Sequence, residues 1–146
     1  MIVYHGSTEI IKNPDVVHSK KYLDFGRGFY ITTFENQAKK WAVRKGMRQE
    51  KAAIVNVYEL AEEWDDFNVL SFEKENEKWL DFVCACRKGQ PLNKEYDIII
   101  GNVADDDVFK TVDMYFRGLW DKEKVLDELR YYKMNNQICI VNQETL

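Results

Sequence analysis

The alternation of apolar and polar positions divides the chain into short strands and amphipathic helices. Apolar, β-branched runs bounded by turn residues predict strands over residues 2–5, 26–33, 52–60, 67–72, 96–101 and 137–141. Apolar residues at helical spacing predict helices over residues 35–49, 74–88, 108–119 and 121–134. Because strands occupy both ends of the chain and helices lie between them, the pattern predicts a mixed α+β domain rather than a regularly alternating α/β one.

Turn and cap residues set the expected limits of the first elements. Gly6 and Ser7 break the first apolar run, so the first strand is expected to end before them. Thr33 is a candidate N-cap for the first helix, with Glu35 near the positive end of the helix dipole. The helix is therefore expected to begin at Glu35.

Composition places the chain among ordinary globular domains. Its 146 residues suffice for one domain, residues 1–146, with a real core. A net charge of -4 argues against sequence-independent binding of nucleic acid, which needs a positive face. No apolar run approaches membrane-spanning length, and no basic-then-apolar leader opens the chain. We therefore expect a soluble, cytoplasmic protein with no membrane partner.

The cysteines do not form a disulfide framework. They are three in number, and Cys84 and Cys86 stand only two residues apart, far from Cys139. A structural zinc site would need further ligands near the first two, and neither His5 nor His18 stands at ligand spacing from them. We expect reduced thiols, with Cys84 and Cys86 on the core side of a helix.

Three consecutive carboxylates, Asp105, Asp106 and Asp107, precede a predicted helix. A carboxylate cluster of this kind is one way to hold a metal ion. The same triplet also caps a helix and compensates the positive end of its dipole. We favour this second interpretation and expect no metal ion in the site.

The second predicted strand follows an arginine that stands between two glycines. This arrangement predicts a tight turn that feeds directly into the strand. Gly26 and Gly28 can adopt backbone angles closed to other residues and let a ligand approach the backbone. Arg27 carries a permanent positive charge that suits forked contact with a phosphate or a carboxylate.

The simpler interpretation of this segment is a hairpin whose aromatic side chains fill a core. We expect Phe25 and Phe29 to lie in the core in either case. The reason is that alternation along the strand turns them away from the side of Tyr30. Tyr30 is then the aromatic residue of this segment that remains for a ligand.

Three strand-associated segments together resemble a known superfamily. They read Tyr4-His5-Gly6-Ser7, Gly26-Arg27-Gly28-Phe29-Tyr30-Ile31, and Asn136-Gln137-Ile138-Cys139-Ile140-Val141. Similar segments carry the His, Tyr and Glu that lie on three separate strands in the ADP-ribosyltransferases of the diphtheria-toxin and poly(ADP-ribose) polymerase type. The chain is more closely similar to a family of small, uncharacterised bacterial proteins placed in that superfamily. Those proteins also combine Asp-Phe-Gly-x-Gly-Phe-Tyr with Tyr-Asp-x-x-Ile-Gly-x-Val-Ala-Asp-Asp, which residues 96–106 match.

The resemblance implies a split, mixed β-sheet of the ADP-ribosyltransferase type, with several helices and NAD as substrate. It implies that the imidazole of His5 bonds a hydroxyl of the nicotinamide-side ribose and that the Gly6 backbone holds the carboxamide. The ring of Tyr30 would stack on the nicotinamide, since aromatic faces hold planar cationic rings well. Ser7 would add a hydroxyl contact to the amide or the ribose.

The turn before Tyr30 is expected to contact the rest of the dinucleotide. Arg27 is our candidate for a pyrophosphate contact. Lys20 and Lys21 are weaker candidates for the same contact, because a pair of loop lysines is usually solvated. Gly28 is expected to let the backbone approach the ligand.

The third segment departs from the polymerase pattern, which has Glu where this chain has Gln137. A carboxylate can stabilise an oxocarbenium ion and take a proton from the acceptor, whereas a neutral amide can only hydrogen-bond. Gln137 therefore argues against chain elongation and leaves single transfer to an acceptor that is already nucleophilic or is activated by another base. A structural role for Gln137, bonding loose backbone groups, fits the sequence equally well, and Glu144 is a weak candidate for a substitute carboxylate.

The sequence thus predicts an NAD-dependent mono-ADP-ribosyltransferase with His5, Tyr30 and Gln137 as catalytic residues. The acceptor would be a protein or a nucleic acid, and bacterial enzymes of this kind are often toxins or regulators. Two alternatives stand beside transfer. One is a catalytically silent module that binds NAD or an ADP-ribosylated partner, and the other is an NAD glycohydrolase with water as acceptor. The sequence does not name the acceptor, and it leaves open a partner protein that inhibits or completes the site.

Overall fold

The computed structural model describes residues 1–17, 23–73, 76–103, 106–129 and 135–146. Lys20, Lys21 and the side chains of the acidic triplet at 105–107 lie outside the described residues. The elements follow in the order β1 (Ile2–Ser7), β2 (Phe29–Ile31), α1 (Glu35–Gln49), β3 (Ile54–Glu59), β4 (Val69–Ser71), α2 (Glu77–Arg87), η1 (Leu92–Glu95), β5 (Ile98–Gly101), α3 (Asp106–Phe116), α4 (Lys122–Leu129), β6 (Gln137–Ile140) and η2 (Gln143–Thr145).

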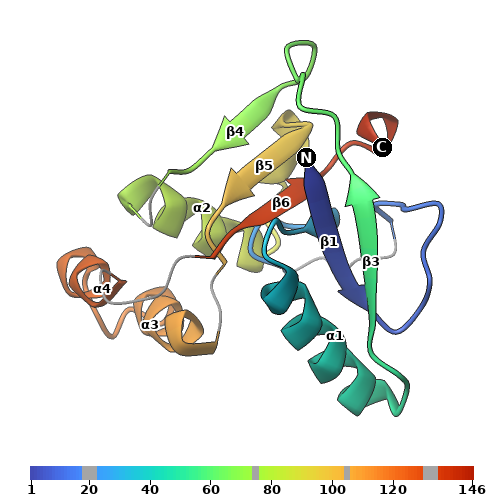
Figure 1. Cartoon of the computed structure of the whole chain (residues 1–146). Helices are drawn as coiled ribbons and strands as arrows, with labels where there is room; N and C mark the ends of the chain where they lie inside the picture. Colours follow the sequence, from blue (N-terminus) through green and yellow to red (C-terminus); the bar gives the residue numbers. More distant parts are fainter. Residues whose placement is uncertain (18–22, 74–75, 104–105, 130–134) are drawn as a thin grey trace.

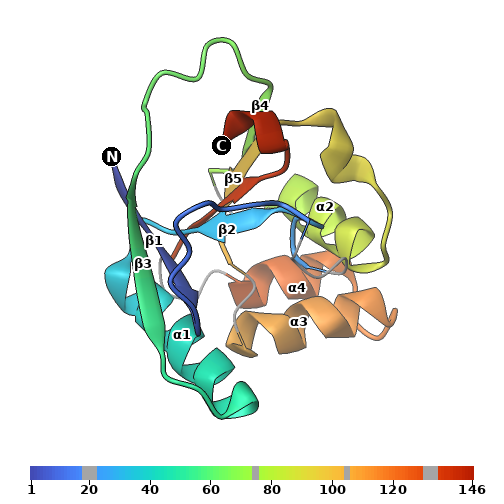
Figure 2. The same cartoon turned by 90° about the vertical axis from the view of Figure 1, so that its right-hand side faces the viewer.

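A four-stranded mixed sheet forms the centre of the molecule. Its strand order is β2-β6-β5-β4, with β4 and β5 parallel and the other pairs antiparallel. β1 and β3 form a separate antiparallel pair, and α1 packs on both of them. In Figures 1 and 2, α1 lies with β1 and β3, whereas α2, α3 and α4 lie together on the other side of β6. The expected α+β class with mixed sheets is confirmed.

Two apolar clusters fill the two faces of the central sheet. On one face, Ile99 and Cys139 pack against buried residues of α2, α3 and α4, including Trp79, Val112 and Val125. On the other face, the packing partners from the sheet are Phe29, Ile31, Ile98, Ile138 and Ile140, and the partner from β1 is Val3. Alternation along each strand explains this division, since successive side chains point to opposite faces. The layers are thus helices, sheet, and the β1–β3 pair with α1.

The sequence signals for element limits are only partly correct. α1 spans the predicted residues, but β1 continues through Gly6 and Ser7 instead of ending before them. The prediction of Thr33 as N-cap is wrong, because Phe34 holds that position without a side-chain cap. The Thr32 Oγ1 accepts a hydrogen bond from the Phe34 N–H at 3.1 Å, which forms a side-chain turn just before the helix.

Both phenylalanines of the turn segment lie in the core, as predicted, but not for the same reason. Phe29 packs on the β1 face, away from Tyr30. Phe25 packs in the helix-side cluster, against which Tyr30 also packs, so the prediction that it turns away from the side of Tyr30 is wrong. Phe25 lies in the turn that Leu23 and Gly26 close, and β2 begins only at Phe29, so strand alternation does not extend to Phe25.

The cysteines behave as expected of core residues. Cys84, Cys86 and Cys139 are all buried and carry free thiols. Within the described residues, no helix is long and apolar enough to span a membrane.

Candidate functional site

The three predicted catalytic residues lie on three strands that follow one another across the molecule. His5 is on β1, Tyr30 on β2 and Gln137 at the start of β6. Tyr4 bridges to Thr32, and β2 pairs with β6. The strand order brings the backbones of these three positions close together, but the His5 ring stacks on Phe29 on the β1 face, whereas Tyr30 packs against the helix-side cluster on the other face. Among the described residues, however, no hydrogen bond joins their side chains to one another.

His5 is held by the backbone of β2. Its Nδ1 lies 2.6 Å from the carbonyl oxygen of Tyr30, and its ring stacks on Phe29 with centroids 4.3 Å apart. A carbonyl can only accept, so Nδ1 carries the proton. Burial lowers the pKa of His5, the bond to Tyr30 opposes this, and the charge of Lys45 lowers the pKa further. The imidazole is therefore neutral near pH 7, with Nε2 as its acceptor atom.

The backbone of Gly6 faces the gap between β1 and β2. The Tyr4 N–H donates to the Thr32 carbonyl at 2.8 Å, and the Thr32 N–H donates to the Tyr4 carbonyl at 2.9 Å. Residues two apart on a strand present their backbone groups to the same edge, so Gly6 faces β2 as Tyr4 does. A continued ladder would pair Gly6 with Tyr30, but no such pair forms within the described residues. The buried Gly6 thus offers one donor and one acceptor to a ligand.

Gly6 also permits the close contact between β1 and α1. A Cβ atom at this position would lie 2.2 Å from the Ala38 carbonyl oxygen and 2.8 Å from the Ala42 nitrogen. The same atom would lie 3.0 Å from the Cβ of Trp41. Any larger residue would push α1 away from β1.

Tyr30 ties the preceding turn to its own strand. Its hydroxyl donates to the Gly26 carbonyl at 2.5 Å and accepts from the Phe25 N–H at 3.0 Å. Burial raises the pKa of Tyr30 well above its usual value, and neighbouring Cys139 and Asp24 add to this effect. The hydroxyl is therefore a neutral donor that holds the turn, and the ring packs against the helix-side cluster.

The two glycines of the turn are required by protein packing. Gly26 has φ +77°, and a Cβ there would lie 2.7 Å from the Asn93 Nδ2. A Cβ at Gly28 would lie 2.4 Å from the Cys139 Sγ. Protein atoms thus fill the space beside the Cα of Gly28, and the approach of a ligand to the Gly28 backbone stays a prediction.

Ser7 and Glu144 take local roles. The Ser7 Oγ accepts a hydrogen bond from the Glu9 N–H at 3.4 Å, where the chain leaves β1. Glu144 is exposed on η2, past the end of β6 that is farther from Gln137. Glu144 therefore does not fold back to supply a carboxylate at Gln137.

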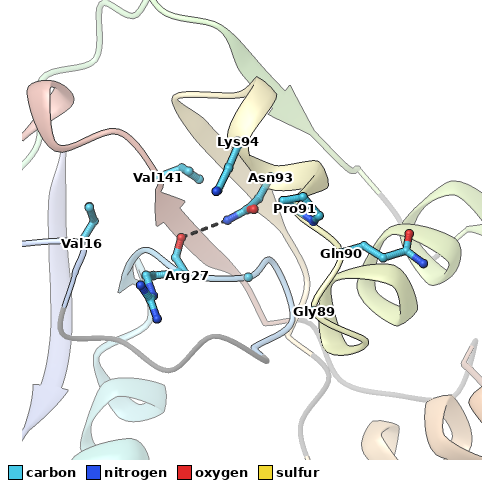
Figure 3. Close-up of a pocket in the computed structure, with 9 residues that line it drawn as sticks. Val16, Arg27, Gly89, Gln90, Pro91, Asn93, Lys94 and Val141 are labelled. Atoms are coloured by element: carbon cyan, nitrogen blue, oxygen red, sulfur yellow. Dashed lines mark hydrogen bonds between the residues drawn. The ribbon is translucent and has the colours of Figure 1, made fainter.

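A cavity of about 550 Å³ lies on the outer side of the turn. Figure 3 shows its lining residues, which come from the turn, from η1 and its approach, and from Val16 and Val141. Arg27 is exposed there, and its carbonyl accepts a hydrogen bond from the Asn93 Nδ2 at 3.0 Å. Lys94 also lines the cavity, but the side chains of Arg27 and Lys94 do not converge in it (Figure 3). His5, Tyr30 and Gln137 do not line this cavity.

Gln137 belongs to a buried polar group that the sequence analysis did not identify. Its Nε2 lies 3.1 Å from the Oδ2 of Asp24 and 3.4 Å from the carbonyl oxygen of Asn102. Asp24 in turn pairs with Arg87, whose Nε lies 2.9 Å from Oδ1. The carboxylate of Asp24 therefore lies directly beside the amide of Gln137, which stands where the polymerase pattern has the carboxylate of a Glu.

Comparison with known proteins places this chain in a family. A family model described as a protein of unknown function (DUF3990) matches residues 1–146. The chain belongs to the DUF3990 family. No curated protein and no solved structure matches this DUF3990 chain.

One candidate site residue, Asp24, was missed by the sequence analysis. Asp24 stands at the start of the turn segment, and its acidic side chain directly before the buried Phe25 was the available signal. Within the described residues, no cluster of three or more His, Cys, Asp or Glu side chains could hold a metal ion.

Proposed function

We propose that this protein is an NAD-dependent mono-ADP-ribosyltransferase with the split-sheet fold of that superfamily. The observation that carries the proposal is the open backbone edge of Gly6 beside Tyr30. The carboxamide of nicotinamide has one carbonyl and one NH₂ group, which complement the N–H and C=O of Gly6. A ligand bound there would continue the pairing that stops after Tyr4 and Thr32.

His5 gives this edge a second specific contact. Its Nε2 is an acceptor in the neutral ring, so it suits a ribose hydroxyl, which donates readily. Its Nδ1 bond to the Tyr30 carbonyl fixes the ring and at the same time takes the place of a Gly6 contact. The ring of Tyr30 would lie against the nicotinamide, with the hydroxyl anchored in the turn.

The proposed reaction begins with heterolysis of the bond between the nicotinamide nitrogen and the anomeric carbon. The electron pair leaves with nicotinamide, which becomes neutral, and the positive charge passes to the ribose ring. An acceptor nucleophile then bonds to the anomeric carbon and loses its proton. Gln137 cannot take that proton, because an amide is not a base at neutral pH. The proton therefore passes to a base on the acceptor or to water, and the acceptor is a protein or nucleic-acid group, as in toxins and regulators of this type.

A catalytically silent NAD-binding module is the second candidate. It is favoured by one observation, namely that Gln137 is buried and its amide nitrogen already bonds Asp24 and Asn102. Such a residue could hold the strand ends together without taking part in a reaction.

The deciding experiment uses NAD labelled in its adenosine half. The purified protein is incubated with this NAD and bacterial lysate, and label on macromolecules and free nicotinamide are both measured. Labelled acceptor supports transfer, and free nicotinamide without labelled acceptor indicates a glycohydrolase. Tight NAD binding without either product would favour the silent module and overturn the transferase proposal.

Variants locate the site in the same assay. We expect His5→Ala and Tyr30→Ala each to weaken NAD binding. His18→Ala is the control for loss of a histidine, and Tyr115→Ala is the control for loss of a ring that packs on the same core from α3. If His5→Ala and Tyr30→Ala bind NAD as the parent does, the ligand site lies elsewhere.

A further inference from the structure

The carboxylate of Asp24 is buried beside Gln137. Only 7% of Asp24 and 3% of Gln137 is exposed to solvent. The Asp24 Oδ1 accepts hydrogen bonds from two nitrogens of Arg87, and its Oδ2 accepts one from Gln137 at 3.1 Å. A buried carboxylate persists only where such partners replace its hydration. The charge of Asp24 is thus built into the fold at the start of β6.

Asp24 also fixes which way the Gln137 amide faces. The Asp24 carboxylate and the Asn102 carbonyl are both acceptors, so the NH₂ group of Gln137 must face them. The Oε1 atom is then turned the other way, and within the described residues it makes no hydrogen bond. The orientation leaves Gln137 as an acceptor for a ligand hydroxyl.

The same carboxylate lies close to Tyr30. The backbone N–H of Phe25, the residue after Asp24, donates to the Tyr30 hydroxyl at 3.0 Å. Cys139 faces Tyr30 across the β2–β6 pair, and Gln137 lies two residues before it on the same face. Asp24 therefore connects two of the three proposed catalytic residues.

We infer that Asp24 is a positioning residue that supplies the negative charge missing at Gln137. The inference rests on the proposed function and identifies the anionic group of that site. An amide whose N–H groups bond a carboxylate is polarised, so that its oxygen becomes a stronger acceptor. The Oε1 of Gln137 then holds a ribose hydroxyl as the sugar gains positive charge, with the carboxylate one amide group away. Asp24 acts through Gln137 and forms no bond to the substrate.

The test exchanges the two side chains. Gln137→Glu places two carboxylates side by side, which disfavours the charged pair. Asp24→Asn removes the charge and keeps the shape. The double variant with both changes restores one carboxylate and one amide in exchanged positions. Gln49→Glu is the matched control, because Gln49 is exposed and its Oε1 accepts from Thr8.

The expected results are specific for each variant. Asp24→Asn and Gln137→Glu should each lower the rate of nicotinamide release about tenfold, with KM for NAD changed less than about threefold. The double variant should recover to within about threefold of the parent. Gln49→Glu should behave as the parent. A faster rate in Gln137→Glu, or no recovery in the double variant, overturns the inference.

A further variant separates this inference from a purely structural ion pair. Arg87→Gln breaks the pair with Asp24 but leaves the carboxylate beside Gln137. If Asp24 acts only to hold α2 to the turn, Arg87→Gln and Asp24→Asn should lower turnover and melting temperature alike. We expect Arg87→Gln to lower the melting temperature and to keep more turnover than Asp24→Asn. Equal loss of turnover in the two variants overturns the inference.

Failure of the proposed function would be visible separately. If the parent neither binds nor cleaves NAD, the transferase proposal fails, and Asp24 has no NAD site to serve. In that case the exchange experiment measures only the melting temperatures of the Asp24 and Gln137 variants. Recovery of stability in the double variant would in that case assign the Asp24–Gln137 pair to the fold and overturn its role in turnover.

Discussion

The imidazole of His5 takes the place of a backbone donor at the carbonyl of Tyr30. Its Nδ1 lies 2.6 Å from that oxygen, at the point where β1 and β2 would otherwise continue as a ladder. The His5 imidazole therefore satisfies the Tyr30 carbonyl of β2, and the facing backbone groups of Gly6 are left without a partner among the described residues. The gap between the two sheets begins at this contact.

Titration of His5 should be visible in the stability of the protein. Because burial lowers the pKa of His5 in the folded state, the unfolded chain binds a proton first as the pH falls. The free energy of unfolding should fall as the pH decreases from about 6.5 to the lower folded pKa, and the imidazole should contribute no pH dependence above that range.

Urea unfolding at a series of pH values checks this prediction. In His5→Gln the decrease in this window should be smaller than in the parent. His18→Gln serves as the control for the second histidine. An unchanged slope in His5→Gln would mean that the imidazole is protonated equally in the folded and unfolded states.

Gly6→Ala should destabilise the protein by about 1–3 kcal/mol, because the new Cβ would overlap backbone atoms of α1. Gly118→Ala is a useful comparison, since Gly118 has φ +74° but no heavy atom within 4 Å of an added Cβ. Its cost should be limited to backbone strain of about 1 kcal/mol. Thermal unfolding of both variants measures the difference, and equal melting temperatures would contradict the tight contact at Gly6.

Tyr30→Phe should separate the two uses of this side chain. Loss of the hydroxyl removes the bonds to Gly26 and Phe25 and should cost about 1–3 kcal/mol of stability. The ring remains, so NAD affinity should change by less than about threefold if stacking is its contribution to binding. Isothermal titration with NAD at a temperature where the variant is folded measures this. An affinity loss as large as that of Tyr30→Ala would assign the hydroxyl to the ligand.

The thiols should be unreactive in the folded protein. Burial raises the pKa of Cys84 to about 11 and that of Cys86 to about 12, and it also raises the pKa of Cys139. Thiolate is the reactive form, so a disulfide reagent at pH 8 should react slowly until urea unfolds the chain. The unfolded protein should then release the full three equivalents. Rapid reaction of one equivalent without urea would show an accessible thiol.

Arg27→Gln should test the phosphate contact without disturbing the fold. Arg27 is exposed, so its replacement should leave the melting temperature unchanged. NAD affinity should fall about tenfold if the guanidinium bonds the pyrophosphate. Lys94→Gln removes a second positive charge that lines the same cavity and is the comparison. Equal affinities for Arg27→Gln and the parent would remove Arg27 from the site.

The local patterns of the sequence were sufficient for α1 but not for the C-terminal end of β1. The apolar spacing of Ala38 and Ala42 predicts a helix whose limits agree with the structure. Gly6 is locally a strand breaker, yet β1 runs through it because pairing with β3 and packing on α1 override the propensity. The order of elements therefore followed from the sequence, while several boundaries depended on packing between distant segments.

Residues of the candidate site could be predicted only where a short sequence segment was enough to identify them. His5, Tyr30 and Gln137 were chosen from three short segments, and the strand order brings those segments to one region. The pairing of Asp24 with Gln137 joins positions 113 residues apart, and no local pattern reports it. The function of these residues stays a prediction until NAD is tested.

The contact between Gly28 and Cys139 means that the presence of this glycine in a sequence does not by itself indicate activity. Because a side chain at residue 28 would collide with the Cys139 sulfur, the glycine is needed for folding whether or not NAD is bound. The same holds for Gly6 against α1. If the proposed function holds, a relative that had lost all turnover would still retain both glycines. Its inactivity would have to be read from positions such as Asp24 and Gln137, where an exchange between carboxylate and amide adds no heavy atom and only the charge changes.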